Sequence, residues 1–392
     1  MWMLLLACTA DPEDTSKKPG PGAGDDTAAE ADTSDPSGDT GDPAAVDWAA
    51  HCDAFLANAA PTFYETNPTY ADDADHSGPW TAVSPEDAGV DGELLAEAGE
   101  VLQQRPFVLS FHVLKGEELV WEQYFHGEAA EDSKNVHSSS KSILGAVTGL
   151  AIDEGHLRRD TLVADLLPEH FSAAMGSEKA DITVEHLLTM TAGFAWTEDV
   201  SEYQLQHEDD WLQAIVDLPL DTSPGFAFNY STAQTHLLGA ALTAASGESL
   251  CVLSHRLLFE PLGIAAEHWG SDPQGYFSGG CNVYLSPREL LRFGQLVLQD
   301  GRWEGEQLLG EGWVSSMLDE QVFTGGGYHY GYLWWMRELG GYPVKIAWGY
   351  GGQLIYVVEP LDLVMLVTTD THDHDPDFDA EDVLESYVIP AL

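Results

Sequence analysis

Strand-like segments lie at both ends of the patterned part of the chain, and helical segments lie between them. Residues 108–125 alternate apolar and polar side chains around a turn at 115–118, which predicts a hairpin. Four later segments are rich in β-branched and aromatic residues and are separated by glycines: 331–336, 344–348, 354–359 and 364–369. The pattern predicts an α+β fold, in which helices flank one antiparallel sheet and residues of about 160–280 form a helical subdomain.

Capping residues and apolar faces predict the helices. Ser84 followed by Pro85 is typical of a helix start, and the apolar residues down to Gln104 fall on one face. Residues 143–152 form a wide apolar stripe before Gly155, where a left-handed C-cap is expected. Further helices are predicted at 184–190, 211–216, 233–245, 250–259 and 287–300.

The first 46 residues lack the pattern of a folded domain. Residues 1–8 are apolar up to Cys8 and resemble the end of a bacterial lipoprotein signal, in which Cys8 would carry the lipid. A secretory signal also needs a basic first region, so either translation starts upstream or Cys8 is an ordinary residue. Residues 9–46 are too polar to offset the entropy of ordering, and we expect a disordered acidic linker. It would tether a folded domain at 47–392, or else be a dispensable tail.

The net charge limits which partners the protein can bind, and the cysteines bear on whether a disulfide can form. With 15 Lys+Arg against 66 Asp+Glu, the formal net charge is −51, which repels nucleic acid and anionic lipid. The remaining cysteines are Cys52, Cys251 and Cys281, and none has the spacing of a metal or redox site. In an exported protein a bridge from Cys52 to one of the others would fasten the N-terminal segment to the body and leave one thiol free.

Ser138 precedes Lys141 by three residues, and no other lysine in the chain has a serine at that distance. On the first turn of a helix, residues at this spacing share a face, so the amine reaches the hydroxyl. The helix N-terminus adds backbone amides that stabilise an oxyanion, and a serine so placed can be a nucleophile. A capping serine with a solvated lysine is the ordinary interpretation, but this lysine begins a buried helix, where a charge needs a partner or a function.

Four ordered blocks resemble the serine β-lactamase-like hydrolases, a family that includes class C β-lactamases, D-alanyl-D-alanine carboxypeptidases, carboxylesterases and 6-aminohexanoate-dimer hydrolases. The blocks are residues 138–142 with 149–155, 182–193, 224–232 and 348–353. The resemblance runs from about Trp80 to Pro390. It implies the β-lactamase/DD-peptidase-like fold for the folded body.

The resemblance also implies roles for single residues. Ser138 would be acylated, and Lys141 and Tyr230 would handle its proton, with the general base left open between them. Both groups ordinarily titrate near pH 10, so making either one a base requires about 4 kcal/mol from its surroundings. Oxyanion or substrate-binding positions fall on Ser138, Thr232, Trp348, Gly349, Tyr350 and Gly351.

Two positions depart from the family pattern. Thr232 replaces an asparagine, and Trp348 stands where β-lactamases have a lysine that binds a substrate carboxylate. The missing cation argues against β-lactamase and peptidase activity. The nearby aromatic residues favour a neutral, aromatic-lined cleft, although alternation predicts that about half of them are core: Tyr328, Tyr330, Tyr332, Trp334, Trp335 and Tyr350.

Three other patterns carry less weight. His137 beside Ser138 suggests a Ser-His-Asp triad, but adjacent residues point in different directions and no GxSxG elbow is present. His186 and His236 fit core positions better than ligand positions. The loop at 370–379 spaces aspartates like a calcium loop but lacks its glycine and final glutamate, so we predict a solvated acidic loop and no metal.

The sequence thus predicts a serine hydrolase that cleaves carboxylic esters or amides through an acyl-enzyme on Ser138. The alternatives are a β-lactamase or penicillin-binding D-alanyl-D-alanine carboxypeptidase-like protein, and a catalytically inactive binding protein of the same fold. We expect a small-molecule ester or amide as the partner, no cofactor, and a location outside the cytoplasm, as an envelope lipoprotein or a secreted protein. The oligomeric state is left open.

Overall fold

The computed structural model describes residues 46–57, 70–71, 80–372 and 378–392. Trp48–Leu392 form one compact unit, and Met1–Asp47 are assigned to a second. Cys8, the expected lipid anchor and nearly all of the expected linker lie outside the described residues, as does the middle of the acidic loop at 373–377.

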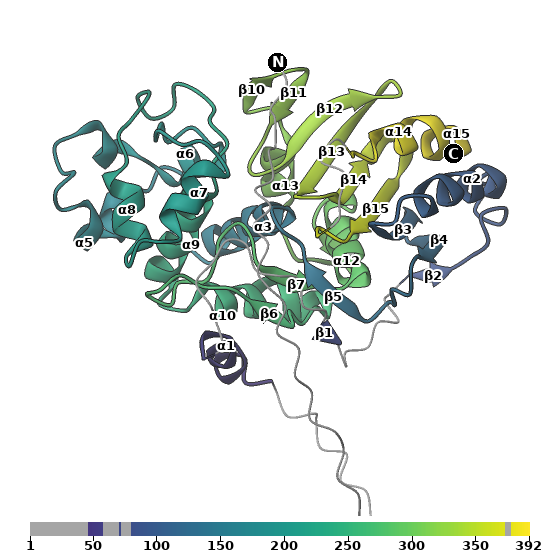
Figure 1. The fold of residues 1–392 in the computed structure, drawn as a ribbon, viewed down its shortest axis with the longest axis horizontal. Helices are drawn as coiled ribbons and strands as arrows, with labels where there is room; N and C mark the ends of the chain where they lie inside the picture. Colours follow the sequence, from purple (N-terminus) through teal and green to yellow (C-terminus); the bar gives the residue numbers. More distant parts are fainter. Residues whose placement is uncertain (1–45, 58–69, 72–79, 373–377) are drawn as a thin grey trace, which may run out of the picture. The chain divides into compact units, whose positions relative to one another are not determined.

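A nine-stranded sheet joins the early and late strands (Figure 1). Its order is β10 (Val322–Gly325), β11 (Tyr328–Tyr330), β12 (Trp335–Leu339), β13 (Tyr342–Gly349), β14 (Gln353–Val358), β15 (Leu363–Thr369), β3 (Val108–Lys115), β4 (Glu118–Tyr124) and β2 (Thr81–Ala82). Neighbours are antiparallel, except that the short edge strand β2 pairs in parallel with β4. The pairing of β15 with β3 confirms the predicted sheet.

Helices cover both faces of the central strands, which is why these strands are apolar at nearly every position. Ile355 and Val364 belong to a cluster that includes α12 (Pro287–Leu298). Their neighbours Leu354 and Met365 point to the other face, where α2 (Gly92–Gln103) and the C-terminal helices pack. The C-terminal helices are α14 (Glu381–Val383), η4 (Leu384–Val388) and α15 (Ile389–Ala391).

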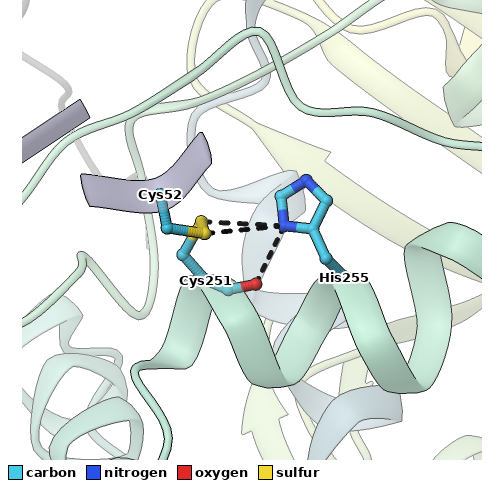
Figure 2. A group of neighbouring side chains, drawn as sticks. All are labelled: Cys52, Cys251 and His255. Carbon is cyan, nitrogen blue, oxygen red and sulfur yellow. Dashed lines mark hydrogen bonds between the residues drawn. A yellow bond between two sulfur atoms is a disulfide. The ribbon is translucent and has the colours of Figure 1, made fainter. Parts of the chain in front are cut away.

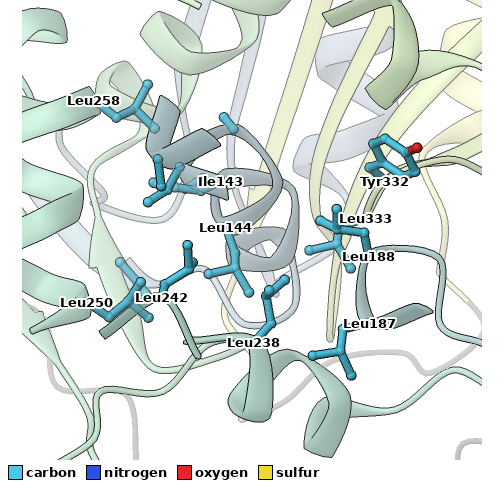
Figure 3. Packing of buried hydrophobic residues seen from close by; sticks show 14 of the residues in the cluster. Ile143, Leu144, Leu187, Leu188, Leu238, Leu242, Leu250, Leu258, Tyr332 and Leu333 are labelled. Atoms are coloured by element: carbon cyan, nitrogen blue, oxygen red, sulfur yellow. The ribbon is translucent and has the colours of Figure 1, made fainter. Parts of the chain in front are cut away.

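A helical lobe lies beside the sheet, and α3 (Ser139–Asp153) contacts both (Figure 1). The elements of the lobe are α4 (Val163–Leu166), α5 (Pro168–Phe171), η1 (Glu178–Asp181), α6 (Val184–Leu188), α7 (Val200–Leu205), α8 (Trp211–Asp217), α9 (Thr232–Ser246), α10 (Leu250–Ser254), η2 (His255–Phe259) and α11 (Glu260–Leu262). Ile143 and Leu144 of α3 point among leucines of α6, α9, α10 and η2 (Figure 3). Residues Ser139 to Ala151 are all buried, as the apolar pattern predicts.

The remaining elements connect or cap these layers. They are α1 (Trp48–Leu56), β1 (Tyr70–Ala71), β5 (Asp132–Asn135), β6 (His268–Trp269), β7 (Val283–Leu285), β8 (Arg302–Trp303), β9 (Glu306–Gln307), α13 (Glu311–Leu318) and η3 (Glu359–Leu361). Strands β1, β5, β7 and β6 form a second sheet. In the described residues no single helix has the length and apolar character to cross a membrane, whereas Thr232–Ser246 and Leu250–Leu262, bent by 81°, meet those criteria together.

Two element boundaries differ from the prediction. The helix expected from Ser84 begins at Gly92, because Ser84 instead accepts the Asp87 amide in a turn and Asp91 caps α2. The strand expected at 331–336 begins at Trp335, because Leu333 has φ 63°, which no strand tolerates.

Cys52 of α1 and Cys251 of α10 form a disulfide, with a Cα–Cα distance of 6.0 Å (Figure 2). The bridge joins residues 199 apart in sequence, and among the described cysteines Cys281 is buried and outside any disulfide. The expected bridge from Cys52 to the body and the one cysteine left outside it are therefore confirmed. His255 flanks the bridge, with Nδ1 3.6 Å from Cys251 Sγ and 2.9 Å from the Cys251 carbonyl oxygen.

Candidate active site

Ser138 lies at the mouth of α3, as predicted. It is half-buried, has helical backbone angles and makes no capping hydrogen bond with its side chain. The preceding residue, His137, has φ 47° and donates its backbone N–H to Asn135 Oδ1 at 2.9 Å, which turns the chain from β5 into the helix. The serine hydroxyl is therefore available for chemistry instead of capping the helix.

Lys141 is 1% exposed and is held by three oxygen acceptors. Its Nζ donates to Ser138 Oγ at 2.9 Å, to Thr232 Oγ1 at 3.0 Å and to the Gly280 carbonyl at 2.9 Å. A Cβ at Gly280 would lie 3.0 Å from Lys141 Nζ, so the glycine leaves room for the amine. Burial of a lysine is tolerated where each N–H has a partner, and this site provides three.

Tyr230 is brought to the same place from the loop before α9. Lys141 Nζ lies 5.1 Å from the centre of its ring. Burial raises the pKa of Tyr230 well above its ordinary value, the negative charge of Glu198 raises it further, and a hydrogen bond with Ser138 acts in the opposite direction. The structure thus gathers Ser138, Lys141 and Tyr230 from two segments about 90 residues apart, the arrangement that the resemblance implies.

The end of β13 closes the site from the sheet side. A Cβ at Gly349 would lie 2.4 Å from the Val136 carbonyl and 3.1 Å from Ser139 Oγ, so only glycine lets this strand approach the start of α3. From the resemblance we also expect the 348–353 block on an edge strand, and this expectation is wrong: β13 is an internal strand of the sheet. Its pairing with β12 nevertheless stops at Ile346, so Trp348 and Gly349 extend past β12 and pair with β14 alone.

The predicted substrate-binding residues divide into two groups. Thr232 accepts a hydrogen bond from Lys141, and the Tyr350 ring lies 5.6 Å from the ring of His137, the residue before Ser138. Gly351 has φ 74°, and a Cβ there would lie 2.7 Å from Thr371, so it abuts this threonine. Its place in an oxyanion hole stays a prediction.

Aromatic rings continue from Tyr230 to Trp348. The Trp335 ring lies 5.4 Å from Tyr230 and 6.3 Å from Trp348, and Tyr328 lies 6.0 Å from Trp348. Tyr328, Trp335, Trp348 and Tyr350 are half-exposed, whereas three others are buried in the core: Tyr330, Tyr332 and Trp334. The expected division of the aromatic residues into core and surface is therefore confirmed.

Sequence reasoning missed two carboxyl groups beside Thr232. Glu198 accepts the Thr232 backbone N–H at 3.1 Å and also accepts the Thr232 hydroxyl. Glu202 on α7 is 8% exposed, and its pKa rises to about 8, chiefly because it is buried and secondly because Glu198 is close, while Lys141 lowers it. Residues 198–210 show no pattern that would have indicated them.

The other histidines have structural partners. His137 Nε2 lies 3.3 Å from Thr371 Oγ1, His186 Nδ1 accepts the Thr183 backbone N–H in a capping box, and His236 Nε2 lies 3.0 Å from Asp272 Oδ2. Within the described ranges, one group of side chains has metal-ligand spacing: Cys52, Cys251 and His255. Its two sulfur atoms are bonded to each other.

Known proteins resemble this chain in sequence and in fold. The family model for β-lactamase matches residues 96–387. A 6-aminohexanoate-dimer hydrolase from Paenarthrobacter ureafaciens is 28% identical over 228 residues, 53% of this chain and 56% of that protein. Esterase EstB from Burkholderia gladioli is 23% identical over 278 residues, 50% of this chain and 70% of that protein. A D-stereospecific amidohydrolase structure from Streptomyces has a TM-score of 0.61 at 19% identity, covering 76% of this chain and 99% of that one.

The curated relatives, the solved structure and the family model support different conclusions about this chain. The chain spans little more than half the length of the first of these curated relatives. The likeness to the solved structure shows the fold, and it confirms the predicted α+β architecture. The family match begins within α2, ends within η4 and contains Ser138, Lys141 and Tyr230. Since it covers well over half of the chain, this protein belongs to the β-lactamase family.

Proposed function

We propose that this protein is a serine hydrolase that cleaves carboxylic esters or amides through an acyl-enzyme on Ser138. The observation that carries the proposal is the 2.9 Å contact between Lys141 Nζ and Ser138 Oγ, with Tyr230 beside both. A nucleophile with a proton-accepting group in hydrogen-bond reach is what covalent catalysis of acyl transfer requires. Relatives named as an esterase and as an amide-type dimer hydrolase support the same reaction class.

Acylation begins when Ser138 Oγ attacks the substrate carbonyl carbon and its proton passes to the Lys141 amine. The carbonyl oxygen becomes an oxyanion at the mouth of α3, where the Ser138 backbone amide and one from the turn at 349–352 would stabilise it. The bond to the leaving group breaks as the alcohol or amine receives a proton. Burial and Glu198 oppose ionisation of Tyr230, so Tyr230 enters as a neutral phenol. It gives its own proton to the leaving group and takes up the proton held by Lys141, which leaves both groups neutral for the next step.

Deacylation repeats these steps with water. A water molecule attacks the carbonyl carbon of the Ser138 ester and gives a proton to the Lys141 amine. The tetrahedral intermediate collapses, the bond to Ser138 Oγ breaks, and the proton passes back to this oxygen. The products are a carboxylic acid and the free serine, so atoms and charges balance.

The surroundings of Trp348 support a neutral substrate. Trp348 is half-buried among Tyr328 and Trp335 and occupies the position of the family lysine. Lys345 on the same strand does not replace that lysine, because its Nζ donates to the Leu318 carbonyl at 2.5 Å. A substrate carboxylate at Trp348 would therefore meet aromatic rings. Arg337 lies over the Tyr328 ring but is paired with Glu381. These surroundings disfavour penicillin-like and peptidoglycan substrates.

The test is active-site labelling and burst kinetics. The wild-type protein is expected to react with a fluorophosphonate probe and to release a burst of nitrophenol from nitrophenyl acetate. Ser138→Ala and Lys141→Ala should lose both signals, whereas Ser315→Ala on the exposed surface of α13 should keep them. Unchanged labelling of Ser138→Ala would refute the proposal, no reaction in the wild type would favour a binding protein, and rapid opening of nitrocefin would favour a β-lactamase.

We also propose that the protein acts outside the cytoplasm, as an envelope lipoprotein or a secreted protein. The bridge between Cys52 and Cys251 supports this location, because disulfides persist in oxidising compartments. Mass spectrometry of the native N-terminus tests the lipid: a diacylglyceryl mass on Cys8 is expected for a lipoprotein. An unmodified N-terminal peptide that contains Cys8 would contradict it.

A further inference from the structure

The carboxyl group of Glu198 is bound to Thr232 twice. It accepts the Thr232 backbone N–H at 3.1 Å and, through its other oxygen, the Thr232 hydroxyl. Trp196 Nε1 also donates to it, at the oxygen that accepts the Thr232 backbone N–H, which adds a third contact to the carboxyl group. Thr232 is 1% exposed, so water does not compete for these contacts. In the reaction proposed above, Glu198 acts only through its charge on Tyr230, and its two contacts with Thr232 have no task.

A threonine hydroxyl carries one proton and can point it in several directions. Because Glu198 takes that proton, the lone pairs of Thr232 Oγ1 face Lys141 Nζ, which donates to them at 3.0 Å. Without this acceptor the hydroxyl can rotate, and it then offers Lys141 a proton where the amine needs an acceptor. Glu202 also forms a hydrogen bond with the Thr232 side chain, but Glu198 alone holds the Thr232 hydroxyl and the Thr232 backbone N–H together. The contact with Glu198 therefore favours the orientation in which Thr232 accepts from Lys141.

The contact between Glu198 and Thr232 also determines where the third hydrogen-bonding position of Lys141 Nζ points. Two of its N–H groups go to Thr232 Oγ1 and to the Gly280 carbonyl. The third position points to Ser138 Oγ at 2.9 Å, as an N–H in the ammonium and as the lone pair in the amine. Loss of the Thr232 anchor frees the amine to turn away from Ser138, and the serine proton then has no aligned acceptor.

We propose that Glu198 is a positioning residue of the acylation step, which acts through the Thr232 hydroxyl to aim Lys141 at Ser138. The inference rests on the proposed function, since it assigns a task within the same reaction. An asparagine in place of Thr232 carries a fixed acceptor oxygen and needs no such partner, whereas a threonine does. Glu198 thus compensates for the departure of Thr232 from the family pattern.

The negative charge of Glu198 also acts on nearby ionisable groups that it does not touch. The experiment must separate this electrostatic effect from the positioning of Lys141 through Thr232. The ionisable groups around Glu198 come from three segments: Glu202 and Asp199 from its own, Lys141 from α3, and Tyr230 from the loop before α9. Of these groups, Glu198 raises the pKa of Glu202, Asp199 and Tyr230. A through-space effect does not need the Thr232 hydroxyl. A positioning effect does, so a double-mutant cycle distinguishes the two.

The experiment measures fluorophosphonate labelling of wild type, Glu198→Gln, Thr232→Val and the double variant. Glu208→Gln is the matched control, because it makes the same change at an exposed position just after α7. Glu198→Gln should lower the maximal labelling rate about tenfold to hundredfold, the range for a lost hydrogen bond to a charged group. The probe concentration for half-maximal rate should stay unchanged. Glu208→Gln should label like wild type.

The double variant gives the sharpest result. If Glu198 acts through Thr232, the double variant is no slower than Thr232→Val, within about twofold. Losses that multiply would overturn the inference, and so would a wild-type rate in Glu198→Gln. Should Glu198→Gln fail to fold, Thr232→Val alone decides, because it keeps the volume and leaves Glu198 in place: a wild-type rate overturns the inference. Labelling that persists in Ser138→Ala overturns the proposed function and this inference together.

Discussion

Glu202 makes the stability of the folded protein depend on pH in a direction unusual for a carboxyl group. Its pKa rises from 4.5 to about 8, first because the side chain is buried and then because Glu198 lies near. Between these two pH values the folded protein holds a proton that the unfolded chain has lost. The contribution of this group to stability is therefore complete below pH 4.5 and falls as the pH rises towards 8.

Glu202→Gln removes this dependence, because glutamine mimics the protonated carboxyl group at every pH. Relative to wild type, the variant should be more stable by about 1 kcal/mol at pH 5, about 3 kcal/mol at pH 7 and about 5 kcal/mol at pH 9. Glu208→Gln, an exposed change two residues beyond Gln206 at the end of α7, should show no comparable trend.

Urea unfolding at the three pH values measures these differences. Tryptophan fluorescence and circular dichroism should give coincident transitions, which justifies a two-state free energy. A stability difference between Glu202→Gln and wild type that is the same at pH 5 and pH 9 would refute the reasoning, since it would mean that Glu202 titrates alike in the folded and unfolded chain. An equal gain in the free energy of unfolding of wild type and Glu202→Gln between pH 5 and pH 8 would refute it as well.

Three further predictions concern packing and the covalent link. Gly349→Ala should cost about 1–3 kcal/mol of stability in urea unfolding and slow labelling, because its Cβ would lie 2.4 Å from the Val136 carbonyl. Gly312→Ala is the control and should cost no stability, because the space around Gly312 is open. Gly280→Ala should slow labelling, because its Cβ would lie 2.2 Å from Thr235 Oγ1 and 3.0 Å from Lys141 Nζ, so that both side chains must shift; a wild-type labelling rate would contradict this close approach. Cys251→Ser should destabilise the protein by about 2–5 kcal/mol and expose α1 to proteolysis; equal protease resistance with and without the bridge would count against it.

Local patterns in the sequence predicted the main elements and the contact between Ser138 and Lys141. Alternation marked β3 and β4, and the apolar stripe with Gly155 marked α3, because side-chain periodicity and caps depend on neighbours within one turn or one strand. The spacing of Ser138 and Lys141 fixed their contact for the same reason, since residues three apart on a helix are neighbours.

The boundaries at Ser84 and at residues 331–336 could not be predicted in this way. Both depend on which of several local options the tertiary packing selects: a turn in place of a helix cap, and a left-handed Leu333 in place of a strand residue. The propensities of these residues allow either choice, and the difference between the choices is small compared with the energy of packing.

The sequence by itself determined the contact between Ser138 and Lys141, the early and late strands and the fold that they build, because these follow from contacts between near neighbours or from the family pattern. Only the tertiary structure decided that Glu198 and Glu202 lie against Thr232 and that Cys52 pairs with Cys251. Such contacts join segments that are distant in sequence, and no periodicity within either segment encodes which partner the fold brings to it.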